Sequence, residues 1–160
     1  MPVRKLKAFL DEHKIKFITI AHSIAYTASE TAELAHVSGK DFAKAVMVRL
    51  DDVMVMCVLR SVDKLDLHLL RSRAGAADAR LANEEEFQGL FPGVDVGAMP
   101  PFGNLYGMAV YVDEALAQSA SIAFNAGSHS EVMRLDWADY QRLVKPTIAR
   151  LSSDELASAI

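Results

Sequence analysis

Two apolar runs separated by a pair of acidic residues constrain the fold of this 160-residue chain more than any other feature. The runs are AVMVRL at 45–50 and VMVMCVL at 53–59, and Asp51 and Asp52 lie between them. Short β-branched runs joined by two turn-forming residues are typical of a β-hairpin. Because both runs are almost wholly apolar, we expect the hairpin to form the centre of a sheet.

The segments before the hairpin predict a helix, a strand and a second helix. Apolar residues recur at helical spacing through VRKLKAFLDEH at 3–13, and FITIA at 17–21 has the composition of a strand. TASETAELAHVSG begins with a capping box, in which Thr27 is the N-cap and Glu30 closes the box, so we expect a short helix there. Gly39 is expected to end that helical region in a left-handed conformation.

The segments after the hairpin supply further helices and strands. Helices are predicted at LDLHLLRSRAG, which ends at Gly75, at NEEEFQGLF, which Asn83 caps, and at DWADYQRLV, which Pro146 stops. Strand composition occurs at MAVYVD (108–113), SIAFNAG (121–127) and EVMRL (131–135). SSDELASAI is expected to add a short helical tail. This order of elements indicates a mixed α+β fold in a single domain spanning residues 1–160.

Composition supports a compact globule outside membranes. Hydrophobic residues make up 51% and charged residues 24% of the chain. No signal peptide is evident, and no apolar stretch reaches the roughly 18 residues that a membrane span needs, so we expect a cytoplasmic protein. Cys57 is the sole cysteine, which excludes an internal disulfide and a two-cysteine metal site. Its apolar surroundings predict inert core packing.

The charge distribution bears on nucleic-acid binding. A formal net charge of −4 argues against broad, non-specific binding, which needs many phosphate contacts, but leaves room for a small local contact. Basic residues gather near the start of the chain, at Arg4, Lys5, Lys7, Lys14 and Lys16. In that segment only Asp11 and Glu12 oppose them. Either a solvated helix face or a local phosphate contact explains this cluster.

Familiar catalytic motifs are missing from the sequence. The histidines show no i, i+4 pair and no HExxH, so a zinc site has little support, and neither GxSxG nor GxGxxG followed by a helix occurs. Four polar residues instead flank predicted strands, where scaffolds usually present functional groups: His22, Lys44, Asn125 and His129. Taken singly, a histidine in such a place is more often an ordinary loop residue, and a lysine such as Lys44 is more often an exposed strand flank.

A glycine- and proline-rich segment is the strongest candidate for a pocket wall. Residues 91–107 hold four glycines and three of the five prolines, so they form a shaped loop rather than a regular element. Within it, VGAMPPFG combines glycines, which permit close backbone approach, with stiffening prolines. Stiff exposed amides suit the stabilisation of an oxyanion or a carbonyl, although the same residues also serve ordinary turns.

Several segments together resemble the YbaK and prolyl-tRNA-synthetase-associated editing domains. The matching stretches are AHSIAYTASETAE, FAKAVMV, VGAMPPFG with its GxxxP spacing, YVDEAL, FNAGSHSEVMRL and LVKP, which run in family order from about residue 20 to 146. The resemblance implies a mixed, partly barrel-like β-sheet flanked by helices. It also implies hydrolysis, in trans, of the ester that links a wrong amino acid to the 3′ end of a tRNA. No metal or organic cofactor is expected.

The resemblance also implies roles for individual residues. Lys44 corresponds to the functional lysine, and Gly97 and His129 join it as catalytic candidates, with Lys44 supplying positive charge and glycine amides holding the carbonyl oxygen. Substrate contacts are expected from His22, Thr27, Met99, Pro100, Pro101, Phe102, Gly103, Asn125 and Gly127. The expected partners are the mischarged tRNA acceptor end and a synthetase that hands it over.

Substrate and activity class stay open at this stage. Members that resemble the alanyl-specific branch tend to carry asparagine directly after the lysine, whereas this chain has Ala45. The favoured substrate is therefore tRNA-Pro carrying a small wrong amino acid, with seryl and threonyl mischarging products as further options. A non-catalytic module that binds a tRNA end, a nucleotide or a protein is the alternative. An unrelated small-ester hydrolase is the third.

Overall fold

The hairpin lies at the centre of one mixed sheet. The computed structural model describes residues 4–23, 25, 28–95 and 97–153. Within these residues the sheet has eight strands in the order β1-β7-β6-β2-β3-β5-β8, and β4 pairs with β2 beside that path. The strands are β1 (Ile18–Ala21), β2 (Phe42–Leu50), β3 (Val53–Arg60), β4 (Ala79–Leu81), β5 (Val110–Asp113), β6 (Ser121–Asn125), β7 (Glu131–Asp136) and β8 (Thr147–Ala149).

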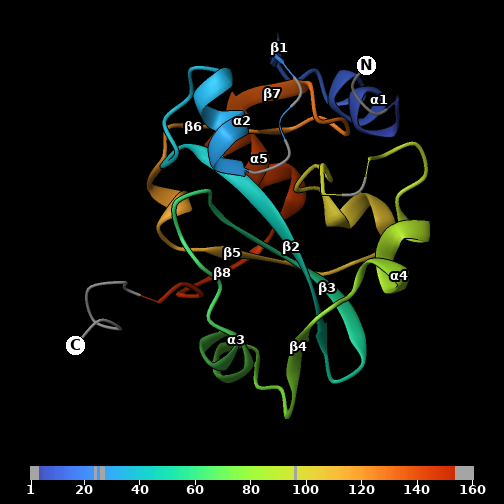
Figure 1. Ribbon diagram of the computed structural model, residues 1–160, viewed down its shortest axis with the longest axis vertical. Helices are drawn as coiled ribbons and strands as arrows, with labels where there is room; N and C mark the ends of the chain where they lie inside the picture. Colours follow the sequence, from blue (N-terminus) through green and yellow to red (C-terminus); the bar gives the residue numbers. More distant parts are fainter. Residues whose placement is uncertain (1–3, 24, 26–27, 96, 154–160) are drawn as a thin grey trace.

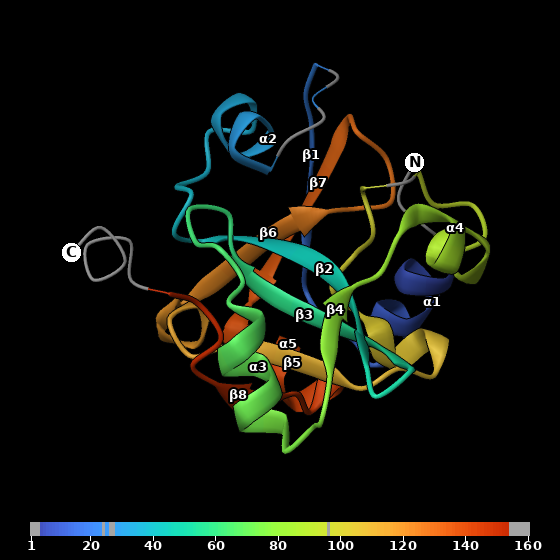
Figure 2. The same ribbon diagram turned by 60° about the horizontal axis from the view of Figure 1, so that its bottom comes forward.

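Five α-helices of the described residues flank this sheet, which confirms the predicted mixed α+β class. They are α1 (Arg4–Glu12), α2 (Ala28–Leu34), α3 (Leu67–Ala74), α4 (Glu84–Phe87) and α5 (Trp137–Val144), with short 3₁₀ turns at Gln88–Leu90, Gly103–Tyr106 and Leu116–Gln118. In Figures 1 and 2, α1 and α4 both lie on one side of the molecule, while α2 lies on the other side and α3 at the far end of the sheet. No described helix has the length and apolarity needed to cross a bilayer.

The turn of the hairpin follows directly from its two acidic residues. β2 and β3 pair antiparallel from Ala43↔Arg60 to Leu50↔Val53. Asp51 and Asp52 both adopt positive φ, at 49° and 66°, as a two-residue type I′ turn requires. Aspartate is among the few residues that tolerate this conformation. The predicted hairpin and its central position are therefore confirmed.

The sheet curves around its main core. β2 pairs parallel with β6, and β5 pairs parallel with both β3 and β8, whereas the other ladders are antiparallel. The largest buried cluster takes side chains from the same face of β2, β3, β5, β6 and β7 and closes them over with α1 and α5. A sheet that wraps one cluster with five of its strands has the partly barrel-like form expected from the resemblance.

Local signals placed most helix ends correctly. α3 begins after Asp66, whose side chain accepts hydrogen bonds from the amides of His68 and Leu69, and ends at Gly75 with φ 67°. α4 carries a capping box between Asn83 and Glu86. α5 ends where Lys145 turns left-handed, directly before the predicted proline stop.

The predicted role of Gly39 is wrong. α2 ends at Leu34, and His36, not the glycine, takes the left-handed conformation with φ 57°. Gly39 lies outside that region of backbone space, and its lack of a side chain serves packing instead: a Cβ there would lie 2.7 Å from Cγ1 of Val62. Sequence spacing cannot distinguish a glycine needed for its φ from one needed for close approach, because only the second depends on a distant segment.

Further elements were missed or lie outside the described residues. The short strands β4 and β8 were not predicted, and β2 begins at Phe42, earlier than the predicted 45. The cap at Thr27 and the helical tail at 154–160 fall on residues that the structure does not describe. Strands of three residues, such as β4 and β8, carry too little periodicity to be recognised without their partners.

The turn of the hairpin allows a matched stability test. Asp51 accepts hydrogen bonds from the amides of Ala77 and Asp78 at 3.0 and 2.8 Å, so Asp51→Gly is expected to lower the free energy of unfolding by about 1–3 kcal/mol. Asp52→Gly removes the cost of a positive φ on a non-glycine residue. It is expected to raise the free energy of unfolding by up to about 1 kcal/mol. Urea denaturation of both variants measures the difference, and equal destabilisation by the two changes contradicts it.

Candidate active site

Lys44 lies inside β2, not beside it. The strand begins at Phe42, and Lys44 is directly opposite Leu59 of β3. Because side chains alternate along a strand, Lys44 shares a face with Phe42 and Val46. Of these apolar neighbours Phe42 is fully buried and Val46 is partly buried, as is Lys44 itself. The exposed strand flank, which was one reading of the sequence, is therefore excluded.

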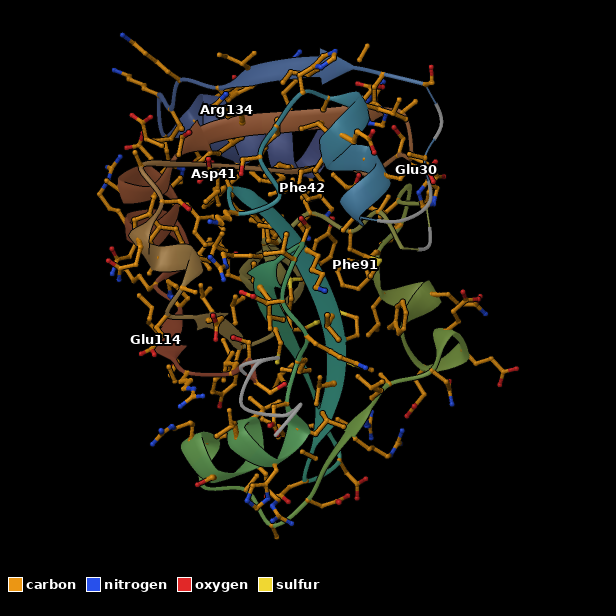
Figure 3. The ribbon with its side chains drawn as sticks, turned by 60° about the vertical axis from the view of Figure 1, so that its left-hand side comes forward. Glu30, Asp41, Phe42, Phe91, Glu114 and Arg134 are labelled. Atoms are coloured by element: carbon orange, nitrogen blue, oxygen red, sulfur yellow. The ribbon has the colours of Figure 1, made fainter. Side chains whose placement is uncertain are left out.

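Asn125 is the neighbour of Lys44 on the adjacent strand. β2 and β6 run parallel with the register Phe42↔Ala123 and Ala43↔Phe124, so Lys44 and Asn125 are the next residues along the two strands. Phe42 and Ala123 belong to one buried cluster, which α2 and the segment after it cover. By alternation, Lys44 and Asn125 point to this same face. Figure 3 shows α2, labelled at Glu30, lying over the start of β2 at Phe42.

The amine of Lys44 has a defined partner. Its Nζ donates a hydrogen bond to the backbone carbonyl of Asp63, in the loop that follows β3. Burial lowers the pKa of Lys44, whereas the nearby charge of Asp63 raises it and that of Lys64 lowers it, with burial the largest effect. An amine whose charged form is disfavoured in this way gains more from an anionic ligand than an exposed lysine does.

The glycine-rich loop meets the loop between β6 and β7. The amide of Asp95 donates to the carbonyl of Gly127 at 2.8 Å. Gly97 faces His129: a Cβ added to the glycine would lie 3.5 Å from Cε1 of the imidazole. Gly97 and Gly127 both have positive φ, at 86° and 103°. These angles turn their peptide groups in directions that other residues rarely adopt.

The segment after β1 completes this arrangement. The amide of His22 donates to the carbonyl of Ser130 at 2.9 Å, and the amide of Ala25 donates to the carbonyl of His129 at 3.0 Å. The structure thus gathers His22, Gly97, Gly127 and His129 around one loop, at the end of β6 where Asn125 lies. The sequence alone had only placed these residues near strand ends.

The remaining loop residues are built into the core. Met99, Pro100, Pro101, Phe102 and Gly103 are all buried. Phe102 is fully buried and packs edge-on against Phe124 and Tyr140, and Tyr140 donates a 2.7 Å hydrogen bond to the carbonyl of Pro101. Of the predicted contact residues, Phe102 and Gly103 therefore lie among core side chains, and Thr27 is outside the described residues.

Two buried polar atoms of the site face no protein partner. Among the described residues, Oδ1 of Asn125 and Nε2 of His22 are buried without a hydrogen bond. The Nδ1 atom of His22 donates to the carbonyl of Ser23 at 2.6 Å, which leaves Nε2 as an acceptor in the neutral ring. Leaving such groups unpaired is costly, so a ligand that donates hydrogen bonds here would be favoured.

Metal ligands do not gather at this site. Within the described residues no three His, Cys, Asp or Glu side chains come close enough together to hold an ion. The groups that the site does offer are an amine, an amide oxygen, imidazole nitrogens and glycine peptide groups. These suit the binding of an anion, the holding of a carbonyl oxygen and the recognition of an amine or a hydroxyl.

Arg60 and Asp63 are the residues that sequence reasoning missed. They belong to the segment RSVDK, which has no periodic pattern and lies between the predicted strand and the predicted helix. Because Lys44 bonds a backbone carbonyl, no side-chain motif could have indicated the partner. Asp113 was noticed only within YVDEAL, and the structure shows that its buried carboxylate holds the amides of Leu151 and Ser152 at 2.7 and 3.0 Å.

Comparison with known proteins places this chain among aminoacyl-tRNA editing proteins. Residues 22–143 match the aminoacyl-tRNA editing domain family. The Multifunctional Ser/Thr-tRNA deacylase ProXp-y of Escherichia coli (strain K12) is 27% identical over 91% of this chain and 89% of its own. The Prolyl-tRNA editing protein ProX of Acetoanaerobium sticklandii is 26% identical over 86% of this chain and 87% of its own.

A solved structure shares the fold. It is described as a candidate trans-editing enzyme for prolyl tRNA synthetase, and it superposes with a TM-score of 0.80 at 21% identity, covering 94% of this chain and 96% of that one. The family match extends over most of the chain and includes Lys44 and both loops of the site. The chain therefore belongs to the aminoacyl-tRNA editing domain family.

Proposed function

We propose that this protein is an aminoacyl-tRNA deacylase that hydrolyses the ester of mischarged tRNA in trans. The observation that carries the proposal is the partly buried amine of Lys44, whose strand β2 pairs with β6, the strand that leads into the loop bonded to the glycine-rich segment. The family match supports it, as do relatives named as a Ser/Thr-tRNA deacylase and a prolyl-tRNA editing protein. The acylated end of tRNA-Pro is the favoured substrate.

The mechanism requires no covalent intermediate, because an aminoacyl ester is already a reactive acyl group. Water adds to the carbonyl carbon, the bond from that carbon to the ribose oxygen breaks, and the ribose oxygen takes a proton. Lys44 supplies positive charge to the terminal phosphate or the ester. The peptide groups near Gly97 and Gly127 hold the developing oxyanion, and His129 assists by hydrogen bonding or proton transfer.

The unpaired polar atoms suggest what the pocket recognises. Oδ1 of Asn125 accepts hydrogen bonds only, so it fits the α-ammonium group of the amino acid or the hydroxyl of serine or threonine. A site built to bond a hydroxyl discriminates strongly against an analogue that lacks it, whereas one methylene is worth only about 1–3 kcal/mol. Small, hydroxyl-bearing amino acids are therefore the favoured cargo, and the prolyl group is disfavoured because it has no side-chain hydroxyl to donate to Asn125.

The first prediction concerns Lys44 directly. Lys44→Ala is expected to reduce deacylation by about 100-fold or more, because it removes the charge that acts on the transition state. Lys40→Ala is the matched control, since Lys40 is an exposed lysine close to Lys44 in the sequence. The measurement is single-turnover hydrolysis of tRNA-Pro carrying serine, threonine, alanine or proline.

The same panel separates the alternative functions. A deacylase hydrolyses the small mischarged products and spares prolyl-tRNA. Binding without turnover identifies a non-catalytic module, and turnover of a simple aminoacyl-nucleotide ester at the same rate identifies a general esterase. Wild-type turnover by Lys44→Ala contradicts the role of the lysine.

We infer further that the N-terminal helix contacts the tRNA backbone. Residues 4–16 hold five basic and two acidic residues, a net +3, whereas the whole chain has a net charge of −4. α1 packs against the glycine-rich loop: the ring of Phe9 lies 6.4 Å from that of Phe102, and Nζ of Lys5 lies 4.8 Å from the centre of the Tyr106 ring. The basic segment therefore borders the loop on which the ester would lie.

Salt dependence tests this contact. Replacing Lys5, Lys7 and Lys14 together by glutamine should weaken tRNA binding and reduce the slope of log K against log salt by about 2–3, since each lost phosphate contact contributes about 0.9. The matched control replaces Lys64, Arg71 and Arg73, exposed cations at and near α3, which lies far from α1 in Figures 1 and 2. An unchanged slope in the first variant assigns tRNA capture to another surface or to a synthetase partner.

A further inference from the structure

The turn that follows β3 is fixed to the chain that enters β2. The amide of Asp63 donates to the carbonyl of Arg60 at 3.0 Å, which closes the turn. Ser61 is buried; its amide donates to the carbonyl of Phe42 at 2.7 Å and its hydroxyl donates to that of Gly39 at 2.9 Å. The close approach of Val62 to Gly39 leaves no space between the two segments. The position of the turn is therefore tied to β2 itself.

An ion pair fixes the orientation of Asp63 within this turn. Nε of Arg60 donates to Oδ2 of Asp63 at 2.6 Å, and Nη2 donates to Oδ1 at 3.0 Å. Both side chains are mostly buried, with 26% and 14% of their surfaces exposed. The hydrogen bonds to Asp63 and the charges of Asp63 and Asp113 raise the pKa of Arg60 against the effect of burial. A bidentate pair of this kind restricts rotation as well as distance.

We propose that the Arg60–Asp63 ion pair is a positioning device for Lys44. The carboxylate of Asp63 is held by Arg60, and the carbonyl of the same residue accepts the hydrogen bond from Nζ of Lys44. Because Arg60 restricts the side chain of Asp63, it also restricts the orientation of the Asp63 peptide group. The carbonyl of that peptide group then determines the position of the Lys44 amine. Neither Arg60 nor Asp63 touches the substrate in this scheme; both act through Lys44. The inference deepens the proposed function and rests on it for its catalytic consequence.

Asp63 acts on Lys44 through charge as well as geometry. The charged groups that influence Lys44 are Asp63, which raises its pKa, and Lys64, which lowers it, while burial lowers it most. Removing the charge of Asp63 takes away a charge that favours the ammonium form, while burial and Lys64 continue to disfavour it. The pKa of Lys44 must then fall further, so the amine loses its proton at a lower pH than in the wild-type protein.

The experiment follows the Lys44 side chain itself by NMR. In protein labelled at lysine, Lys44→Ala identifies the resonance of Lys44, which is then titrated in wild type, Asp63→Asn, Arg60→Gln and Arg60→Lys. Asp63→Asn should lower the titration midpoint, Arg60→Gln should shift the resonance, and Arg60→Lys should restore part of the wild-type signal. Arg80→Gln is the matched control, because it removes another bidentate pair, to Glu86 at 2.7 and 2.8 Å, and should leave the signal of Lys44 unchanged.

Kinetics of the same variants test the consequence. Asp63→Asn and Arg60→Gln should each lower kcat by about 10–100-fold with little change in KM, because a small displacement of a catalytic group has an effect of this size. In a Lys44→Ala background, adding Asp63→Asn should cause no further loss, since residues that act through one another are not additive. Additive losses indicate that the pair acts independently of Lys44.

The outcomes distinguish this inference from the proposed function. The NMR titration needs no substrate, so a protein that hydrolyses no aminoacyl-tRNA yet shows the shifts keeps the positioning device and loses the deacylase assignment. An unchanged Lys44 resonance and midpoint in both Asp63→Asn and Arg60→Gln overturns the positioning device whether or not activity falls. Circular dichroism of each variant separates a local change from unfolding.

Discussion

The structure depends on the pairing of β2 with three other strands. β3 lies along the whole of one side of β2, while β6 pairs with its start and β4 with its end on the other side. The side chains of β2 contribute to buried clusters on both faces of the sheet. Because the strand is fixed along its length, its register determines that Lys44 projects toward the face it shares with Phe42. The hydrogen-bonded ladder of β2 fixes the backbone of Lys44, although the lysine side chain is itself flexible.

A lysine in such a strand incurs a desolvation penalty for its charge, which its surroundings must offset. Burial disfavours its charged form, and the carbonyl and the charge of Asp63 offset that penalty only in part. An approaching phosphate or a developing oxyanion therefore stabilises the charged form of the Lys44 amine. A leucine or a valine at this position would suit the apolar face better, so its presence favours a functional rather than a structural explanation.

The two loops that meet at Gly127 combine rigid anchors with unusual backbone. Phe102 and the hydrogen bond from Tyr140 to Pro101 hold one loop in the core, and the amide of Asp95 ties it to the other loop at Gly127. Gly97 and Gly127 then present peptide groups in left-handed conformations. These buried residues therefore support the loop that carries Gly97. Such support is what keeps a catalytic geometry within the tolerance that the chemistry needs.

The sequence by itself determined the features that arise from neighbouring residues. The Asp51–Asp52 turn, the cap at Asn83 and the glycine end at Gly75 each depend on interactions within a few residues, which explains why they were predicted correctly. The role of Gly39, the short strands β4 and β8 and the partner of Lys44 depend on segments that are distant in sequence. Only the tertiary structure decides these features, because a close approach or a backbone hydrogen bond between remote segments leaves no periodic pattern in either of them.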